Sequence, residues 1–324
     1  MYKRMLSFFD KYNILTKDQY GFRKNRSTSL AAFNLVKSIL NNINNKVPTS
    51  ALFLDLSKAF DFVHHSNLTD KLNKIGIRGP ALEWFKSYLS NRSQITRITK
   101  FDNKINSIVN FDSQSRHNRF GVPQGSILGP PLFLVYVNDF PQAIEKDCVL
   151  FADDTTVILD CKNFETYESD INNTLHKIST WLENNDLKLN VEKTKILNFK
   201  TQKSKFIQLK INHKNQLIEQ VRKIKFLGIT LDEHFTWKDH IDEICIKINK
   251  FVFALKKIKE ETSKPTAVIV YHAYICSIIR YGIIVWGNSS EMSRILIAQK
   301  KCIRAIFNMD WTESCRPVFK SQNF

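Results

Sequence analysis

Three aspartates stand at positions where a carboxylate could take part in chemistry. Asp55 lies in ALFLDLS at 51–57, a segment that otherwise reads as a strand buried on both faces, where a carboxylate without a charged partner is costly. Asp153 and Asp154 separate CVLF from TTVIL, which predicts a hairpin with both carboxylates at its tip. Each position has a plainer alternative: Asp55 at the exposed end of a strand, and the pair as ordinary turn residues.

Taken together, the three carboxylates indicate a metal site. If the two strands lie side by side in one sheet, Asp55 meets the pair Asp153 and Asp154 at one end. Carboxylates held so close repel each other unless a divalent cation neutralises them, and an oxygen-only ligand set suits Mg²⁺. Two such ions a few ångströms apart are the recurring device of in-line phosphoryl transfer, so the set predicts synthesis or cleavage of nucleic acid.

The segment FGVPQGSILGPPLF is a further candidate for ligand contact. Three of the nine glycines of the chain fall within nine residues here, Gly121 and Gly125 among them, which favours a backbone shaped for close approach to a ligand. Gln124 adds an amide that could bond a nucleotide sugar or base. The alternative is an ordinary kinked loop before a helix over 132–140.

The composition limits the classes of protein that remain. The chain has 324 residues, 43% of them hydrophobic, and 48 Lys and Arg against 31 Asp and Glu, a net charge of +17. The hydrophobic content and the small number of glycines exclude a disordered or collagen-like chain. The positive net charge makes nucleic acid the first candidate partner, with steering of an acidic substrate as the weaker alternative. The six cysteines form no C-x-x-C pair, and the amino terminus lacks a secretory h-region, so we expect a reduced, soluble, intracellular protein.

Amphipathic helices and short strands alternate along the chain and would position these residues. We expect α+β structure up to a boundary near 230–236 and mostly helices after it. The apolar run from Thr266 to Trp286 is interrupted by His272 and Arg280, which favours a buried helix over a membrane span. The remaining predicted helices are at 30–42, 68–75, 81–89 and 167–181, with another beginning at 241. The predicted strands are at 51–57, in two hairpins over 94–111 and 148–159, and near 187–199 and 206–228.

Several motifs, in this order, resemble those of reverse transcriptases of non-LTR, LINE-type retrotransposons, and most of all the jockey-like elements of arthropods. They are FLDLSKAFD, FGVPQGSILGP, FADD, LKLNVEKTK and FLGI. DQYGFRKNRST at 18–28 is similar to the fingers motif of that family, and YGIIVWG at 281–287 and QKKCIRAIF at 299–307 are similar to its post-thumb segment. The resemblance covers about residues 15 to 310, and six motifs in order are very specific.

The resemblance implies catalytic roles for individual residues. Asp55 matches the first catalytic carboxylate, and Asp153 and Asp154 match the pair that follows it in the family. Asp55 and Asp153 would be the main ligands of two Mg²⁺ ions, for which Mn²⁺ may substitute, and Asp154 would complete the acidic cluster. Lys193 matches the basic residue that protonates the leaving pyrophosphate, with Lys195 as its rival.

The resemblance also implies residues that bind the nucleotide. Phe60 matches the aromatic gate that disfavours a ribose 2′-hydroxyl, with simple core packing as the alternative. Gln124 and Gly125 match the motif that lines the nucleotide and template pocket. Arg23 and Arg26, together with Lys24 between them, match the fingers motif that contacts template or triphosphate. On the residues alone, these cations would be read as a solvated basic patch.

The resemblance implies a right-hand polymerase fold of the α+β class, with partial fingers, a palm built on an antiparallel sheet, and a helical thumb. Fingers and palm would occupy residues 1–230, and the thumb and post-thumb helical segment 231–324. Phe226, Leu227 and Gly228 resemble the primer grip. Thumb lysines would face the duplex backbone, unless they form only a solvated helix face. They are Lys247, Lys250, Lys256, Lys257 and Lys259.

The implied function is RNA-directed DNA polymerase, with an RNA template, a DNA primer and dNTPs as partners and no membrane. The family implies action in the nucleus. Relatives carry more chain on both sides, so we expect a chain truncated at both ends, whose missing endonuclease a full-length element would supply. Two alternatives stay open: a catalytically inactive, truncated nucleic-acid-binding remnant of such an element, and a group II intron-type maturase, which would need a basic extension after the thumb.

Overall fold

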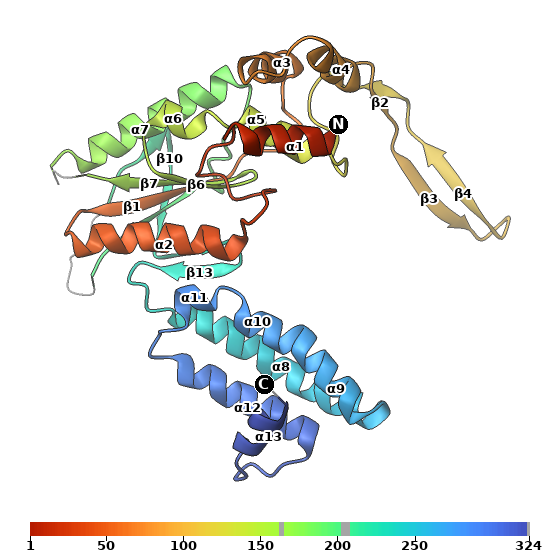
Figure 1. The fold of residues 1–324 in the computed structure, drawn as a ribbon, viewed down its shortest axis with the longest axis vertical. Helices are drawn as coiled ribbons and strands as arrows, with labels where there is room; N and C mark the ends of the chain where they lie inside the picture. Colours follow the sequence, from red (N-terminus) through yellow and green to blue (C-terminus); the bar gives the residue numbers. More distant parts are fainter. Residues whose placement is uncertain (162–164, 202–207, 323–324) are drawn as a thin grey trace.

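A five-stranded sheet forms the centre of the molecule in the computed structural model, which describes residues 1–161, 165–201 and 208–322 (Figure 1). Its strand order is β11-β8-β1-β7-β6, and every neighbouring pair is antiparallel except β8 with β11. The strands are β1 (Thr49–Leu54), β6 (Cys148–Phe151), β7 (Asp154–Asp160), β8 (Lys195–Phe199) and β11 (Glu219–Val221). The hairpin of β6 and β7 is the one predicted around the aspartate pair.

The central strand β1 is buried on both faces. Leu52 and Leu54 pack into one hydrophobic core, and Ala51 and Phe53 pack into the other, because successive side chains of a strand point to opposite sides. Figure 1 shows α7 on one side of this sheet and α2 on the other. The helices that cover the two faces are α2 (Thr28–Asn44), α5 (Gly129–Tyr136), α6 (Phe140–Ile144) and α7 (Tyr167–Asn184).

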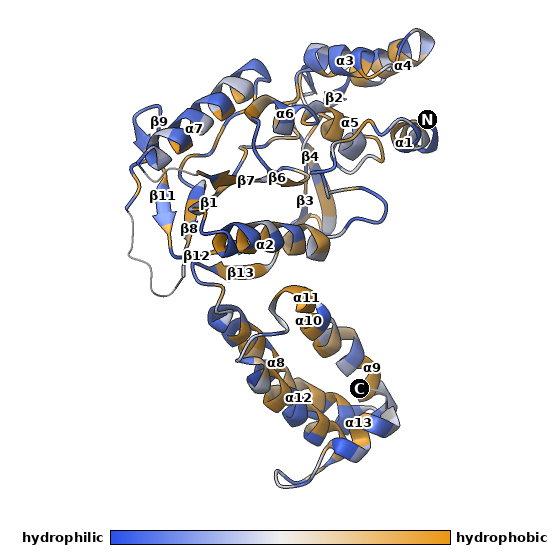
Figure 2. Cartoon of the chain, turned by 60° about the vertical axis from the view of Figure 1, so that its left-hand side comes forward, coloured by the Kyte–Doolittle hydropathy of each residue, from blue (hydrophilic) through white to orange (hydrophobic). Residues whose placement is uncertain are grey.

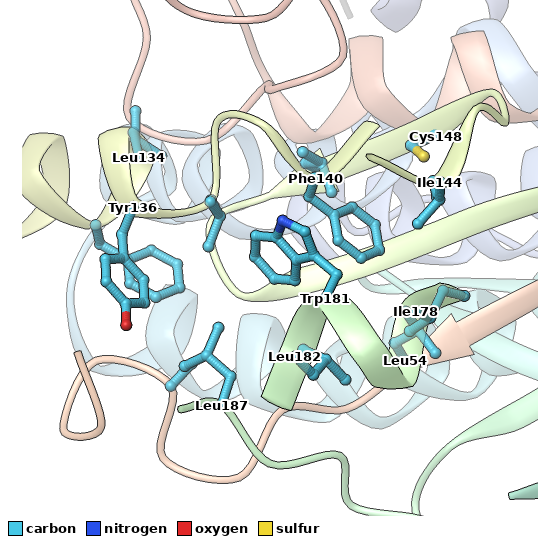
Figure 3. Packing of buried hydrophobic residues seen from close by; sticks show 14 of the residues in the cluster. Leu54, Leu134, Tyr136, Phe140, Ile144, Cys148, Ile178, Trp181, Leu182 and Leu187 are labelled. Atoms are coloured by element: carbon cyan, nitrogen blue, oxygen red, sulfur yellow. The ribbon is translucent and has the colours of Figure 1, made fainter. Parts of the chain in front are cut away.

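Aromatic side chains close the core between the sheet and α7 (Figure 3). Phe140 at the start of α6 meets Trp181 of α7 in a T-shaped, edge-to-face arrangement, at 4.9 Å between ring centroids and an interplanar angle of 75°. The hydroxyl of Tyr136 donates to the carbonyl oxygen of Asn185 at 2.6 Å, which satisfies the polar end of a fully buried ring. This packing fixes α7 and the chain that follows it against the sheet.

The chain around this central sheet forms helices and two small hairpins. The helices are α1 (Tyr2–Lys11), α3 (His65–Lys74) and α4 (Pro80–Leu89). The hairpins pair β2 (Ser93–Gln94) with β5 (Arg116–His117) and β3 (Arg97–Asp102) with β4 (Ser107–Asp112). The β3–β4 hairpin is the one predicted over 94–111, and it projects away from the body (Figure 1).

The final third is helical, as predicted, and follows a small hairpin of β12 (Lys223–Phe226) and β13 (Ile229–Asp232). Figure 2 shows polar and apolar residues alternating along α8 and α12, the pattern of amphipathic helices that pack on one side. The helices are α8 (Lys238–Glu261), α9 (Lys264–Val270), η1 (Tyr271–Cys276), α10 (Ser277–Arg280), α11 (Ile283–Trp286), α12 (Met292–Phe307) and α13 (Arg316–Gln322). Another small pair joins β9 (Asn212–His213) to β10 (Gln216–Leu217).

Three predicted elements differ from the structure. The run from Thr266 to Trp286 is not one buried helix: helical backbone continues through α9, η1 and α10 to Arg280, the chain turns at Tyr281 and Gly282 before α11, and Ile269 and Ile284 are each 67% exposed. No helix among the described residues has both the length and the apolar character needed to cross a membrane. The helix expected over 132–140 begins at Gly129 and ends at Tyr136. The strand expected near 187–199 forms only over β8, and 206–207 of the next one lie outside the described residues.

Candidate active site

The register of the sheet brings the three aspartates to one end of its strands. Leu54 lies opposite Thr155 in the antiparallel pair of β1 and β7, so the next residues, Asp55 after β1 and Asp154 at the start of β7, lie at the same end of the two strands. Asp153 is the second residue of the two-residue turn between β6 and β7. Asp55 therefore does stand at a strand end, as its plainer alternative supposed, but it faces the other two carboxylates.

The carboxyl group of Asp154 lies close enough to Asp153 and Asp55 for their charges to affect its pKa. Desolvation by the surrounding chain is the largest cause that raises the pKa of its carboxyl group, although the residue as a whole is exposed, and the charges of Asp153 and Asp55 raise it further. Among the described residues, no three His, Cys, Asp or Glu side chains form a ready-made metal site. The oxygen-only donor set nevertheless fits Mg²⁺, and the part of the raised pKa of Asp154 that Asp153 and Asp55 cause reflects repulsion that a cation would relieve.

The segment LKLNVEKTK folds against the backbone of Asp55. The N–H of Asn190 donates to the carbonyl oxygen of Asp55 at 2.8 Å, and the N–H of Asp55 donates to Oγ1 of Thr194 at 3.3 Å. The hydroxyl of Thr194 in turn donates to the carbonyl oxygen of Asn190 at 2.7 Å. The N–H and the carbonyl oxygen of Asp55 are thus both hydrogen-bonded, which fixes the backbone from which its carboxylate projects.

The two candidate lysines of this segment differ in their surroundings. Lys195 forms an ion pair with Glu219, and its side chain is only 24% exposed. Lys193 is exposed, and within the part of the chain that the structure describes its ammonium group forms no ion pair. The surroundings therefore favour Lys193 over Lys195 as the residue able to reach a phosphate.

The segment DQYGFR runs alongside the hairpin that carries the aspartate pair. The N–H of Tyr20 donates to the carbonyl oxygen of Leu150 in β6 at 2.7 Å. The side-chain oxygen of Gln19, a buried residue, accepts from the N–H groups of Gly21 at 2.7 Å and Ala152 at 3.1 Å. Because Ala152 directly precedes the aspartates, this segment positions their turn.

Gln19 is a residue that the sequence reasoning missed. The resemblance drew attention to the cations of the fingers motif, whereas a glutamine two residues before a glycine gives no distinct signal of its own. Arg23 donates to the carbonyl oxygen of Thr16 at 2.6 Å, and Arg26 lies over the ring of Tyr20 at 4.9 Å. These two arginines therefore shape the same loop and are not simply solvated, while Lys24 is exposed.

The loops around Phe60 and Gln124 are joined to each other. The amide of Gln124 donates to Oδ1 of Asp61 at 2.8 Å. Gly121 has φ +86°, and a Cβ there would lie 3.0 Å from Cα of Asp61, so only glycine permits this approach. The ring of Phe60 stacks on Phe133 at 4.2 Å, which satisfies its packing alternative, yet the residue remains half-buried beside the loop.

A cavity of about 660 Å³ opens beside Gln124. Three cations line it: Lys58, Arg92 and Arg119. The sequence reasoning missed Arg92 and Arg119, because they flank the projecting hairpin and meet only when its two ends come together. Gly125 has φ +76° and no atom within 4 Å of a Cβ built on it, so the backbone is open next to this cavity.

The predicted primer grip is a tight turn between β12 and β13. Leu227 and Gly228 form it with φ angles of +45° and +83°. Phe226 is buried and meets Phe53 of β1 at 5.8 Å between centroids, which ties the hairpin to the sheet. The turn thus lies on the face of the sheet opposite α7.

The lysines predicted to belong to a thumb divide into two groups. Lys257 pairs with Glu260, and Lys259 donates to the side chain of Asn308. The others are exposed and form no ion pair in the described ranges: Lys247, Lys250 and Lys256. Their contact with a duplex stays a prediction.

Comparisons with known proteins bear on this site. Residues 1–231 match the family described as reverse transcriptase (RNA-dependent DNA polymerase). The chain is 28% identical, over 97% of its length, to the RNA-directed DNA polymerase from mobile element jockey of Drosophila melanogaster. It is 29% identical, over 94% of its length, to the probable RNA-directed DNA polymerase from transposon BS of the same species. The chain spans 34% of the length of each of these curated relatives. A solved structure of telomerase from Candida albicans with a fragment of telomeric RNA aligns with 100% of the chain and 57% of its own, at 12% identity and a TM-score of 0.47.

Proposed function

Because this chain belongs to the reverse transcriptase (RNA-dependent DNA polymerase) family, we propose that it adds dNTPs to the 3′-hydroxyl of a DNA primer by copying an RNA template. The observation that carries this proposal is the meeting of Asp55, Asp153 and Asp154 at one end of the strands of an antiparallel sheet. A net charge of +17 supports nucleic acid as the partner. The predicted similarity to the enzymes of jockey-like, non-LTR retrotransposons is confirmed. We infer a right-hand polymerase fold from this family membership.

The three aspartates would hold two Mg²⁺ ions, or Mn²⁺ in their place. When bound, such ions activate the 3′-hydroxyl and neutralise the charge on the leaving pyrophosphate. Asp55 and Asp153 would be the main ligands, and Asp154 would complete the acidic cluster. Lys193 would give a proton to the pyrophosphate, a role that its exposed ammonium group supports.

The remaining site residues would orient the substrates. Phe60 would exclude a ribose 2′-hydroxyl, and Gln124 with Gly125 would line the nucleotide and template pocket. Arg23 and Arg26 would place the fingers loop over template or triphosphate. The primer grip of Phe226, Leu227 and Gly228 would hold the growing end.

The proposed division of the chain assigns fingers and palm to 1–230 and thumb with the post-thumb segment to 231–324, a boundary that falls inside β13. We propose that nicked target DNA serves as the primer and that the endonuclease of a full-length element makes the nick. We place the reaction inside the cell, in the nucleus.

Primer extension tests this function. The chain is incubated with a DNA primer on an RNA template, dNTPs and Mg²⁺, beside Asp153→Asn and a matched control, Asp147→Asn. Asp147 is an exposed carboxylate that immediately precedes β6, at the end of that strand away from the aspartate turn. We expect extension by the wild type and the control, loss of extension in Asp153→Asn, and loss in all three when EDTA removes the metal.

Two outcomes would contradict the proposal. Equal extension by Asp153→Asn and the wild type would place the chemistry outside the Asp cluster. No extension by the wild type, with salt-sensitive binding to the primer–template duplex retained, would favour the inactive nucleic-acid-binding remnant.

A further inference from the structure

The YGIIVWG segment at 281–287 lies directly on the turn between β12 and β13. The hydroxyl of Tyr281 donates a hydrogen bond to the carbonyl oxygen of Leu227, the first residue of that turn. The ring of Tyr281 lies against Gly228, because a Cβ built on Gly228 would be 3.3 Å from its Cε1 atom. One side chain therefore contacts both residues of the turn.

The rest of the segment fixes Tyr281. The indole N–H of Trp286, a fully buried residue, donates to the carbonyl oxygen of Tyr281 at 3.0 Å. Gly282 has φ +65°, and a Cβ there would come within 2.5 Å of Cδ1 of Ile229 in β13. Glycine at this position thus allows the segment to lie against the strand that follows the turn.

Helix α8 holds the same strand from a second direction. The backbone N–H of Thr230 donates to Nδ1 of His240 at 3.3 Å, and the hydroxyl of Thr230 donates to Oε1 of Glu243 at 2.7 Å. The ring of His240 meets that of Trp286 at 5.6 Å between centroids. The contacts of α8 and those of the YGIIVWG segment are therefore parts of one connected network.

The turn needs support from outside its own hairpin. Leu227 has φ +45°, a left-handed conformation that is unfavourable for a residue with a Cβ. Among the described residues, strands β12 and β13 pair with each other and with no other strand, and an isolated two-stranded hairpin is at best marginally stable in water. Phe226 anchors the base of the hairpin on β1, and Tyr281 holds its tip by a hydrogen bond, where the side chain of Leu227 also packs against the core.

We propose that Tyr281 is a positioning residue for the primer terminus. It acts through Leu227 and Gly228, whose place in the primer grip belongs to the proposed function on which this inference rests. The YGIIVWG segment thereby couples the helical thumb to the alignment of the 3′-hydroxyl. Loss of the Tyr281 hydroxyl should loosen the turn, and slow the chemical step without weakening the binding of the duplex.

The test uses the full chain with Tyr281→Phe and a matched control, Tyr274→Phe. Tyr274 is a 43% exposed tyrosine of the same helical region that stacks on Phe251. In single-turnover extension, we expect Tyr281→Phe to lower the maximum rate about 10- to 100-fold, since a misplacement of the order of 1 Å has effects of that size. The dissociation constant for primer–template should change less than about twofold, and the control should match the wild type. An unchanged maximum rate would overturn the inference.

Hydrogen exchange on the protein alone provides a second readout that needs no catalysis. Amides of residues 224–231 should exchange faster in Tyr281→Phe, while those of β1 stay protected in both variants. Unchanged exchange over 224–231 would overturn the inference even if the enzyme is active. A wild type that fails to extend primers, with a turn that still loosens in Tyr281→Phe, would refute the polymerase proposal and leave the structural role of Tyr281 standing.

Discussion

Replacement of Gly21 by alanine should separate the fingers segment from the turn that carries the aspartates. A Cβ on Gly21 would lie 2.4 Å from the backbone nitrogen of Ala152 and 3.1 Å from the carbonyl carbon of Phe151. Ordinary contact begins near 3.4 Å, so the two backbones must part by about 1 Å (3.4 − 2.4). Both of these atoms belong to the main chain, so the closest contact, with the nitrogen of Ala152, cannot be relieved by rotation of a side chain; the third neighbour is Oε1 of Gln19 at 3.1 Å.

The magnitude follows from the position of Ala152, which directly precedes Asp153. A shift of about 1 Å passed on to this carboxylate should lower the extension rate about 100-fold, or about 2.7 kcal/mol in activation free energy. The hydrogen bond from the Ala152 N–H to Gln19 would weaken with the same movement. Single-turnover primer extension with saturating dNTPs measures the rate, and thermal denaturation verifies that the variant is folded.

Gly79→Ala is the matched control. Gly79 has φ +58° but no atom within 4 Å of a built Cβ, so alanine there strains only the local backbone before α4. It should lower the melting temperature slightly and leave the extension rate unchanged. A folded Gly21→Ala variant that extends primers within about twofold of the wild type would refute the reasoning, because the proposed coupling of the fingers segment to Asp153 would then be absent.

Two further predictions concern titratable groups. Lys193→Ala should slow single-turnover extension about 100-fold, as expected for loss of a general acid. Lys195→Ala should lose only the surface ion pair with Glu219 and extend primers nearly normally. The reverse ranking of the two rates would assign the proton transfer to Lys195. Burial lowers the pKa of His240 from 6.5 to about 4, so between these pH values the unfolded chain binds a proton that the folded chain does not. The free energy of unfolding should therefore fall as the pH drops, by about 3 kcal/mol near pH 4.5. Urea denaturation at a series of pH values should show a shallower fall in the His240→Gln variant than in the wild type. Parallel plots of unfolding free energy against pH for the two proteins would contradict this prediction.

The local patterns of the sequence predicted most of the elements that surround the site. The short apolar segments on either side of Asp153 and Asp154 favour a tight hairpin. The apolar segment before Asp55 has the length of one buried strand. Helix α7 followed from its apolar stripe. In each case the information lies within about ten to twenty neighbouring residues, the range over which periodicity is informative.

Contacts between distant segments could not be predicted in the same way. Gln19 accepts from Ala152, 133 residues away, and nothing near Gln19 encodes that partner. The ion pair that distinguishes Lys195 from Lys193 depends on the parallel register of β8 and β11. The run up to Trp286 was wrongly predicted as one buried helix because hydrophobicity counts apolar residues without revealing the bend at Gly282.

The placement of β1 at the centre of the sheet has a consequence for synthesis of the chain on the ribosome. Leu54 pairs with Thr155, 101 residues later, and the other edge of β1 pairs with β8, which is synthesised later still. At roughly 5–20 residues per second, this apolar strand stays unpaired for about 5–20 s after it is made. Its two open edges are exposed to other nascent chains during that interval, so yield should depend on chaperones and on slow, cool expression more than on the stability of the finished fold.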